Sequence, residues 1–434
     1  MTWRRDWTRI ELKTERNQMR RTINMAAVTS AWFSRIVRTG KLQNACPIHA
    51  CYAIHAVQGR DYSSQPRVIK NPTTASLKRG TGGRSSFNGI VCTVFGCSGF
   101  IGGNLSIRLG RIGSQLILPY RCDPYHIKEL KVGGDLGQVL YHPFHLKDEE
   151  SIIRCMKYSN VVVNCIGTKN ETSNFTFKQV HVDGARRLAR LAKECNVERF
   201  IQVSCLNVSK DPEPIMLKEG SKMLKTKWEG EQAVREEFPE ATIVRPSVVY
   251  GHQDRFIAHY MNDKRLIYTN KIPLWDAGEK TEKQPVLIHD VISGIVSIIR
   301  NPDTAGKTYQ FVGPKRYTLN HIVTSFYDLA MKHYGERRVK VINMKYHPYA
   351  WLKTSVWEYI YTVHPKADLL WEVLEFHHTS DKIDPTLPTL EDLGITPTTL
   401  ESQIEWQIKP YEHCRADIAE LERITMPKVQ SVPK

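Results

Sequence analysis

The sequence predicts an α/β fold in which a doubly wound parallel sheet is followed by a smaller, mainly helical C-terminal domain. Three observations lead to this prediction. Short β-branched runs alternate with helix-periodic segments from about residue 88 to residue 316. A glycine-rich turn joins the first of these runs to a helical segment. From about Tyr317 onward, the pattern changes to helices rich in aromatic and basic residues.

The composition is that of a globular chain with two or three domains. The chain has 434 residues, of which 41% are apolar and 24% charged. These values exclude collagen-like, coiled-coil and wholly disordered proteins. The best candidate for a membrane span, residues 291–299, is only nine residues long, whereas a spanning helix needs about 18 apolar residues. A spanning protein is therefore excluded, and a peripheral membrane protein stays open.

Cysteines and histidines do not form a recognisable pattern. The ten cysteines are scattered, and none belongs to a Cys-x-x-Cys pair. Several lie in apolar runs, as Cys165 does, so we expect buried free thiols and no disulfide framework. The close histidine pairs are His142 with His145 and His377 with His378, and neither has a third ligand nearby in the sequence. We expect no metal site.

Residues 1–62 are predicted to be a mitochondrial transit peptide. From Arg16 to Arg60 there is no Asp or Glu but there are seven Lys or Arg, around a short amphipathic segment. The alternative is a disordered basic arm that binds nucleic acid or an acidic lipid surface. Met25 resembles an initiator, which would make residues 1–24 an upstream extension. Residues 63–87 are expected to be a flexible lead-in, because they are rich in Pro and Gly.

Positive charge remains when the predicted transit peptide is set aside. The formal net charge is +16, and residues 1–62 hold eleven Lys or Arg against four Asp or Glu. That surplus of seven leaves +9 for the rest of the chain. An acidic partner or an anionic lipid surface therefore stays open as a contact.

A glycine turn, GCSGFIG, follows the first predicted strand at residues 90–95 and leads into a helix-periodic segment. Glycines at this spacing let the backbone turn tightly and approach a pyrophosphate, whose charge then lies at the helix N-terminus. A glycine pattern alone is weak, but its place between a strand and a helix makes it specific. The residues expected to bind a dinucleotide here are Gly96, Ser98, Gly99, Phe100, Ile101 and Gly102.

The second predicted strand, residues 114–120, ends at Arg121, nineteen positions after Gly102. An acidic residue at this place would bind the ribose 2′-hydroxyl of NAD, whereas an Arg accommodates the 2′-phosphate of NADP. Asp123 lies two residues further on and would favour NAD if it took that role. The alternative is that Arg121 merely flanks a strand end. The sequence favours NADP(H) over NAD(H), and FAD is not expected.

The alternation of strands and helices continues beyond Arg121. One helix is predicted at residues 148–157, and another has apolar residues at helical spacing from Ala185 to Cys195. The further predicted strands are residues 138–144, 160–166, 199–203 and 241–244. This repetition predicts a Rossmann-type doubly wound sheet over residues 88–316.

A specific set of motifs spans residues 89–313. Besides the glycine turn, they are Asn164-Cys-Ile-Gly167, Val203-Ser204, Arg245-Pro-Ser-Val-Val-Tyr-Gly251 and Val286-Leu-Ile-His-Asp-Val291. On these motifs the chain resembles an extended or atypical short-chain dehydrogenase/reductase. It resembles more closely the NADPH-binding accessory subunits of mitochondrial respiratory complex I. The segments that carry this closer resemblance are PYRC at residues 119–122, GDLGQ at 134–138, SNVVVN at 159–164 and QDRF at 253–256.

The resemblance implies additional nucleotide contacts from later strand ends. Those residues are Leu146, Cys165, Ile166, Gly167, Ser204, Lys227 and Pro246. One departure concerns the adenine end, where relatives often have an Asp-x-x-Asp run after the third strand. This chain has His145-Leu-Lys-Asp148 instead, so the contacts to the adenine stay open.

The catalytic pattern of this superfamily is incomplete. It uses a Ser and a Tyr-x-x-x-Lys pair one helical turn apart, and the tyrosine passes the proton. Ser204 and Lys227 are in place, but Met223 stands at the tyrosine position, and no tyrosine lies between Tyr158 and Tyr250. A thioether has no proton to donate. The sequence therefore predicts a nucleotide pocket without dehydrogenase turnover, with Ser204, Met223 and Lys227 as vestiges of the catalytic set.

Residues 317–425 are expected to form a helical cap or interface domain, followed by a basic tail at residues 426–434. The aromatic stripe from Trp351 to Trp371 would ordinarily be core. The alternative is an interface, because Trp and Tyr are enriched at protein contacts and at membrane surfaces.

The resemblance implies a non-catalytic accessory subunit of mitochondrial complex I, the NADH:ubiquinone oxidoreductase, that binds NADP(H) structurally and supports assembly or stability. The implied location is the matrix side of the inner membrane, as a peripheral protein. The implied partners are other complex I subunits. The residual positive charge leaves an anionic lipid surface open as a further contact, and no nucleic acid is expected. The alternative is an active NADP-dependent reductase or epimerase of the mitochondrial matrix. A protein that binds RNA ranks last, because no RNA motif is visible.

Overall fold

The computed structural model describes residues 78–80, 83–261, 266, 271–334, 339–361 and 369–408. All of these residues belong to one compact unit, Lys70–Lys434. The predicted transit peptide (residues 1–62) and basic tail (residues 426–434) lie outside the described residues. Within the described part, no helix combines the length and the apolar character needed to cross a membrane.

A parallel sheet of seven strands forms the centre of the larger domain, in the order β11-β6-β5-β4-β1-β2-β3. Every neighbouring pair in this sheet is parallel. The strands are β1 (Val91–Phe95), β2 (Gln115–Tyr120), β3 (Val139–Pro143), β4 (Val161–Asn164), β5 (Arg199–Val203), β6 (Thr242–Pro246) and β11 (Thr308–Phe311). The order reverses between β1 and β4, which confirms the predicted doubly wound sheet.

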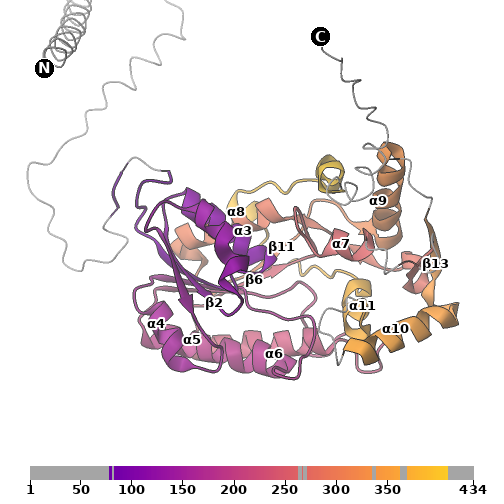
Figure 1. Ribbon diagram of the computed structural model, residues 1–434, viewed down its shortest axis with the longest axis horizontal. Helices are drawn as coiled ribbons and strands as arrows, with labels where there is room; N and C mark the ends of the chain where they lie inside the picture. The colour runs from indigo at the N-terminus through magenta and orange to yellow at the C-terminus, as the bar shows by residue number, and fades with distance from the viewer. Residues whose placement is uncertain are drawn as a thin grey trace, which may run out of the picture. The chain divides into compact units, whose positions relative to one another are not determined.

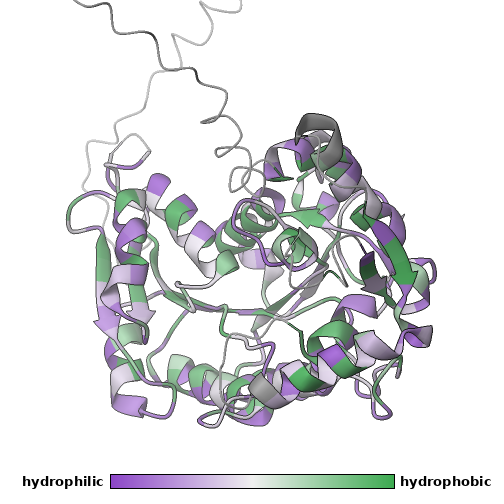
Figure 2. Ribbon diagram, turned by 45° about the vertical axis from the view of Figure 1, so that its right-hand side comes forward, coloured by the Kyte–Doolittle hydropathy of each residue, from purple (hydrophilic) through white to green (hydrophobic). Residues whose placement is uncertain are grey.

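Helices cover both faces of this sheet (Figure 1). On one face lie α3 (Phe100–Arg111) and α8 (Ile288–Arg300), and on the other lie α4 (Glu149–Met156), α5 (Ala185–Glu194) and α6 (Lys222–Glu237). Figure 2 shows hydrophobic and hydrophilic residues alternating around these helices, as expected where one side packs and the other meets solvent.

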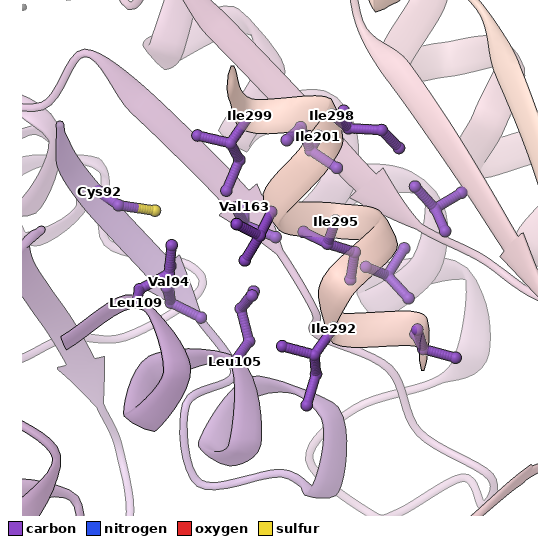
Figure 3. Close-up of a cluster of buried hydrophobic side chains, with 14 of the residues drawn as sticks. Cys92, Val94, Leu105, Leu109, Val163, Ile201, Ile292, Ile295, Ile298 and Ile299 are labelled. Carbon is purple, nitrogen blue, oxygen red and sulfur yellow. The ribbon is translucent and has the colours of Figure 1, made fainter. Parts of the chain in front are cut away.

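The alternation of side chains along β1 divides the core into two layers. Cys92 and Val94 point toward α3 and α8, where they meet side chains such as Leu105 and Ile295 (Figure 3). Val91 and Phe95 belong to the opposite layer, with residues of α4, α5 and α6. Because β1 is buried on both faces, its sequence is mostly apolar rather than alternating.

Two features of the sheet differ from the sequence predictions. The strand expected at residues 160–166 ends at Asn164, whose side-chain Oδ1 accepts a hydrogen bond from Ile166 N at 3.0 Å. That bond turns the chain out of the sheet. β11 was not predicted, because its four residues carry no distinctive pattern and depend on β6 for pairing.

The folded domain begins before residue 88. Arg79 and Phe87 exchange two backbone hydrogen bonds of 2.9 Å each. Arg84 forms a 2.9 Å ion pair with Asp135 and also donates to the Gly134 carbonyl. The end of the segment expected to be a flexible lead-in is therefore attached to the sheet domain.

A second core lies beyond the sheet and is shared by two stretches of the chain. The first stretch contributes β7 (Val249–Tyr250), α7 (Phe256–Met261), β8 (Lys271–Leu274), β9 (Glu282–Lys283) and β10 (Val286–Leu287). The second contributes β12 (Tyr317–Thr318), α9 (Leu319–Tyr334), β13 (Lys340–Asn343) and a helical segment at residues 400–408. The helices α10 (Pro348–Tyr361) and α11 (Trp371–His378) lie in the same stretch and pack in a separate small cluster. Tyr250 and Phe256 from the first stretch pack with Phe326 and Ile404 from the second. The second core therefore crosses the boundary expected at residue 316.

Candidate nucleotide-binding site

The glycine turn between β1 and α3 has the geometry that close backbone packing requires. Gly96 has a φ of +81°, and a Cβ there would lie 2.9 Å from the Cys165 carbonyl oxygen. A Cβ on Gly102 would lie only 2.2 Å from the Gly96 oxygen. Gly99 is the N-cap of α3 and supplies no side-chain cap. The first backbone N–H groups of α3 are thus available to an anion.

A cavity of about 260 Å³ lies beside this turn, at the carboxyl ends of β1, β4, β5 and β6. The expected nucleotide-binding residues that line it are Gly99, Phe100, Ile101, Gly102, Cys165, Gly167, Ser204, Lys227 and Pro246. Met223 lines it as well. Parallel sheets of this kind hold their ligands at this edge, where the strand order reverses.

The remaining expected residues lie outside the lining of this cavity. Gly96 and Ser98 form the turn itself. Leu146 is buried in the core between the sheet and α5, and Ile166 packs against the same core. Arg121 is exposed directly after β2, with its guanidinium carbon 5.0 Å from the centre of the Phe175 ring.

Asp123, the residue that would favour NAD, is engaged elsewhere. Its carboxylate accepts a 2.9 Å hydrogen bond from Tyr125 N and so caps the 3₁₀ segment η2 (Pro124–Gly133) between β2 and β3. This local role leaves Arg121 as the charged side chain at the end of β2.

Met223 is part of a small apolar cluster rather than a polar catalytic centre. Its side chain is buried with Phe177, Cys205 and Leu224, and Phe376 packs against the same group. α6 starts beside it with Ser221 as N-cap. The thioether therefore adds apolar surface to the cavity at the position where the sequence pattern leads us to expect a phenol.

Ser204 and Lys227 remain available to a ligand. Ser204 is buried, and its Oγ has no hydrogen-bond partner among the described residues. A buried hydroxyl without a partner is costly, and a bound polar group would satisfy it. Lys227 is half-buried on the cavity wall. Burial raises the pKa of the neighbouring Cys205 thiol, and the Lys227 ammonium offsets this only in part.

His181 ties one wall of the cavity to α6. It lies on the π-helical segment η3 (Gln179–Gly184), and its Nε2 accepts a 3.2 Å hydrogen bond from Thr168 N. Its Nδ1 lies 3.0 Å from Thr226 Oγ1. Burial, helped by the charge of Lys227, lowers the pKa of His181 to about 3. The neutral ring thereby holds the loop after β4 against the helix that carries Met223.

Sequence reasoning missed the part of the cavity wall contributed by distant segments. Lys169, Arg255, Phe376 and His377 also line the cavity. Arg255 lies in the QDRF segment, which carried no assigned role, and His377 was considered only as a metal ligand. Among the described residues, no cluster of His, Cys, Asp or Glu could hold a metal ion. No local pattern places Phe376 and His377 beside a turn near residue 100.

Two buried acidic side chains fasten the C-terminal segment to the sheet domain. Glu375 on α11 accepts backbone hydrogen bonds from Ile215 (2.7 Å), Met216 (2.6 Å) and Leu217 (3.2 Å). Asp381 forms a 3.4 Å ion pair with Lys283, and both side chains are at most 2% exposed. Asp381 also accepts hydrogen bonds from the side chains of Asn207 and Ser247 and from the backbone N–H of Gln284.

Comparison with known proteins bears on the identity of the site. Residues 92–312 match the model of the NAD dependent epimerase/dehydratase family. Over 330 residues the chain is 42% identical to NADH dehydrogenase (ubiquinone) 1 alpha subcomplex subunit 9, mitochondrial, from Mus musculus. The match covers 75% of this chain and 82% of the mouse protein. The chain belongs to this subunit 9 family, within the epimerase/dehydratase family.

Other relatives agree with membership of the subunit 9 family. The NADH-ubiquinone oxidoreductase 40 kDa subunit, mitochondrial, from Neurospora crassa is 35% identical, over 78% of this chain and 85% of that protein. Among solved structures, MoeE5 in complex with UDP-glucose and NAD is similar with a TM-score of 0.53 at 16% identity, over 75% of this chain and 99% of that one. This last likeness concerns the fold.

The residues of the cavity suit an anionic dinucleotide. The glycine turn leaves room that a side chain would fill, and Ser204 Oγ offers an unused polar atom. The charged residues among those that line the cavity are Lys169, Lys227 and Arg255, and no carboxylate joins them. A cavity with this charge favours phosphate groups.

Proposed function

We propose that the chain is a non-catalytic accessory subunit of mitochondrial complex I that holds NADP(H) as a structural ligand. The single observation that carries this proposal is the combination in one cavity of an intact glycine turn with a buried Met223 at the position of the proton donor. A ligand that binds only the folded state stabilises it without any turnover. The names of the mouse and Neurospora relatives supply the complex to which the subunit would belong.

Different residues of the cavity would bind different parts of the dinucleotide. The backbone of the glycine turn and the start of α3 would bind the pyrophosphate. Ser204 and Lys227 would bind the nicotinamide ribose, and Gly167 and Pro246 would border the nicotinamide ring. Bound NADPH could supply a hydride, but Met223 has no proton to accompany it. Arg121, with Asp123 engaged in capping, supports NADP(H) rather than NAD(H).

We also propose a peripheral position at the matrix side of the inner membrane, and an exposed apolar and aromatic face supports the contact with a membrane surface. α10 and the turn before it expose Tyr346, Leu352, Val356 and Tyr359, with exposed fractions from 47% to 79%. Glu358 is the one acidic residue in the α10 sequence. Tyr, Trp and Leu beside lysines suit the interface of an anionic bilayer.

The assembly proposal predicts a single location for the chain. In native electrophoresis of detergent-solubilised mitochondria, mass spectrometry should find it in the complex I band and not as a small soluble species. Alkaline extraction of that band for NADPH, and acid extraction of a second sample for NADP⁺, should together release close to one nucleotide per complex. A small soluble species that oxidises NADPH steadily with a carbonyl substrate would instead support the matrix reductase.

The membrane proposal predicts binding of the full chain to vesicles. The protein should sediment with vesicles that contain cardiolipin and should bind neutral phosphatidylcholine vesicles less. Leu352→Glu together with Val356→Glu should weaken this binding by about tenfold or more, because two apolar side chains no longer enter the interface. Leu136→Glu is the matched control, since Leu136 is fully exposed but lies between η2 and β3. Equal binding by all three proteins would refute a role for α10.

A further inference from the structure

Two cationic side chains contact the same aromatic ring, that of Phe175, outside the cavity. The Arg121 guanidinium carbon lies 5.0 Å from the centre of the Phe175 ring, and Lys147 Nζ lies 4.9 Å from the same point. Lys147 Nζ also donates to the Asn174 carbonyl at 3.4 Å. Within the described residues, no carboxylate lies within ion-pair distance of either cation.

This arrangement leaves positive charge without a counter-charge. Because each cation lies about 5 Å from the ring centre, the two are at most about 10 Å apart. Like charges at this separation repel each other, and the ring face offsets only part of that cost. An anion that contacts both cations would remove the repulsion, so the trio has the properties of an anion-binding site.

The position of the trio points to one end of the dinucleotide. Arg121 directly follows β2 and Lys147 follows β3, its neighbour in the sheet, so both lie at the edge that carries the cavity. The residue after the second strand is the one that meets the 2′-position of the adenosine ribose. Phe175 comes from the loop after β4, where Thr172 and Phe175 exchange hydrogen bonds of 3.0 and 3.2 Å. Gly167, Thr168 and Lys169 at the start of that loop line the cavity.

We propose that Lys147 and Phe175 complete, with Arg121, a binding site for the 2′-phosphate of NADP(H). Arg121 and Lys147 bind the phosphate, whose charge of about −1.5 to −2 matches two cations. Phe175 is a positioning residue that holds both cations by its ring face. The inference rests on the proposed binding of a dinucleotide in the cavity, and it adds the residues that select the phosphorylated form.

The site can be tested with fragments that differ only in the place of a phosphate. Calorimetric titration of the purified full chain compares 2′,5′-ADP with 5′-ADP, and NADPH with NADH. Lys147→Ala should weaken 2′,5′-ADP and NADPH by about tenfold, through the loss of one charge-assisted contact. It should leave 5′-ADP and NADH unchanged, and Lys147→Arg should restore most of the affinity. Phe175→Leu should weaken the same two ligands.

A matched control lies elsewhere on the surface, at the C-terminal end of α4. Lys157 Nζ is 5.5 Å from the ring centre of exposed Tyr158, so Lys157→Ala removes an equivalent cation from an equivalent ring. This variant should bind all four ligands as the wild type does. An equal loss for all four ligands in Lys147→Ala, or no loss, would overturn the 2′-phosphate site while the dinucleotide proposal stands. A wild-type chain that binds neither NADPH nor NADH would overturn both.

Discussion

Gly102→Ala is expected to empty the nucleotide cavity. The new methyl carbon would lie 2.2 Å from the Gly96 carbonyl oxygen and 2.9 Å from the Gly96 carbonyl carbon. Both are backbone atoms, so the start of α3 must move away from the turn to relieve the contact. The N–H groups that would hold the pyrophosphate move with it. We expect NADPH affinity to fall at least 100-fold, and stability to fall by about 1–3 kcal/mol from overpacking.

The neighbouring residue provides the control for this change. A Cβ on Gly103 would lie 3.2 Å from the Cys97 oxygen and 3.7 Å from a Leu130 methyl group. These contacts need only a small adjustment, and alanine is the better helix former. Gly103→Ala should therefore retain its nucleotide. The measurement is the nucleotide released per protein on denaturation, together with the thermal midpoint. A Gly102→Ala protein that keeps a full complement of NADPH would contradict this account of the turn.

Asp381→Ala is expected to have the largest effect on folding. It leaves the Lys283 ammonium buried without its counter-ion, since both side chains are at most 2% exposed. It also removes the acceptor for the side chains of Asn207 and Ser247 and for Gln284 N. Removal of one partner of a buried ion pair costs about 3–5 kcal/mol. The free energy of unfolding from urea titration should fall by that amount.

The adjacent residue again provides a control for Asp381. Lys382 pairs with Glu213, but both side chains are about two-thirds exposed. Lys382→Ala should therefore cost less than about 1 kcal/mol. Adding Lys283→Met to Asp381→Ala should recover part of the loss, because the stranded charge is gone. Equal destabilisation by Asp381→Ala and Lys382→Ala would contradict the importance of the buried Asp381–Lys283 ion pair.

The stability of the C-terminal segment bears directly on the nucleotide cavity. Phe376 and His377, a few residues before Asp381, form part of the cavity wall. Glu375 beside them holds the backbone N–H groups of residues 215–217 ahead of α6, the helix that carries Met223. Loosening this segment would therefore open the cavity, and a bound nucleotide would in turn stabilise the segment. A ligand that stabilises the fold without turnover would act through this coupling between the C-terminal segment and the cavity.

Local sequence patterns were sufficient for six of the seven strands of the sheet and for the glycine turn at its edge. β1, β2 and β4 are short runs of mostly apolar residues, and their burial on both faces is what such runs indicate. The glycine spacing before α3 identified the turn, because few other residues tolerate backbone contacts this close. The prediction that methionine stands at the tyrosine position, residue 223, also needed only local sequence, because the Tyr-x-x-x-Lys spacing is a property of one helix.

Those local patterns could not predict which distant segments pack together. β11 is four residues long, and its place beside β6 depends on helix α8 returning the chain across the sheet. Phe376 and His377 reach the cavity only because Glu375 and Asp381 fasten the segment around them. Periodicity reports which side of an element is buried, but not which distant element buries it.

The glycine turn, the order of strands and helices up to β6, and the prediction about Met223 follow from residues that are neighbours in the chain. The second core, the C-terminal wall of the cavity, and the meeting of Arg121, Lys147 and Phe175 were decided by tertiary structure. The physical reason is that the first group depends on backbone conformation and local spacing. The second depends on contacts between segments separated by tens to hundreds of residues, which exist only once the strands and helices have packed.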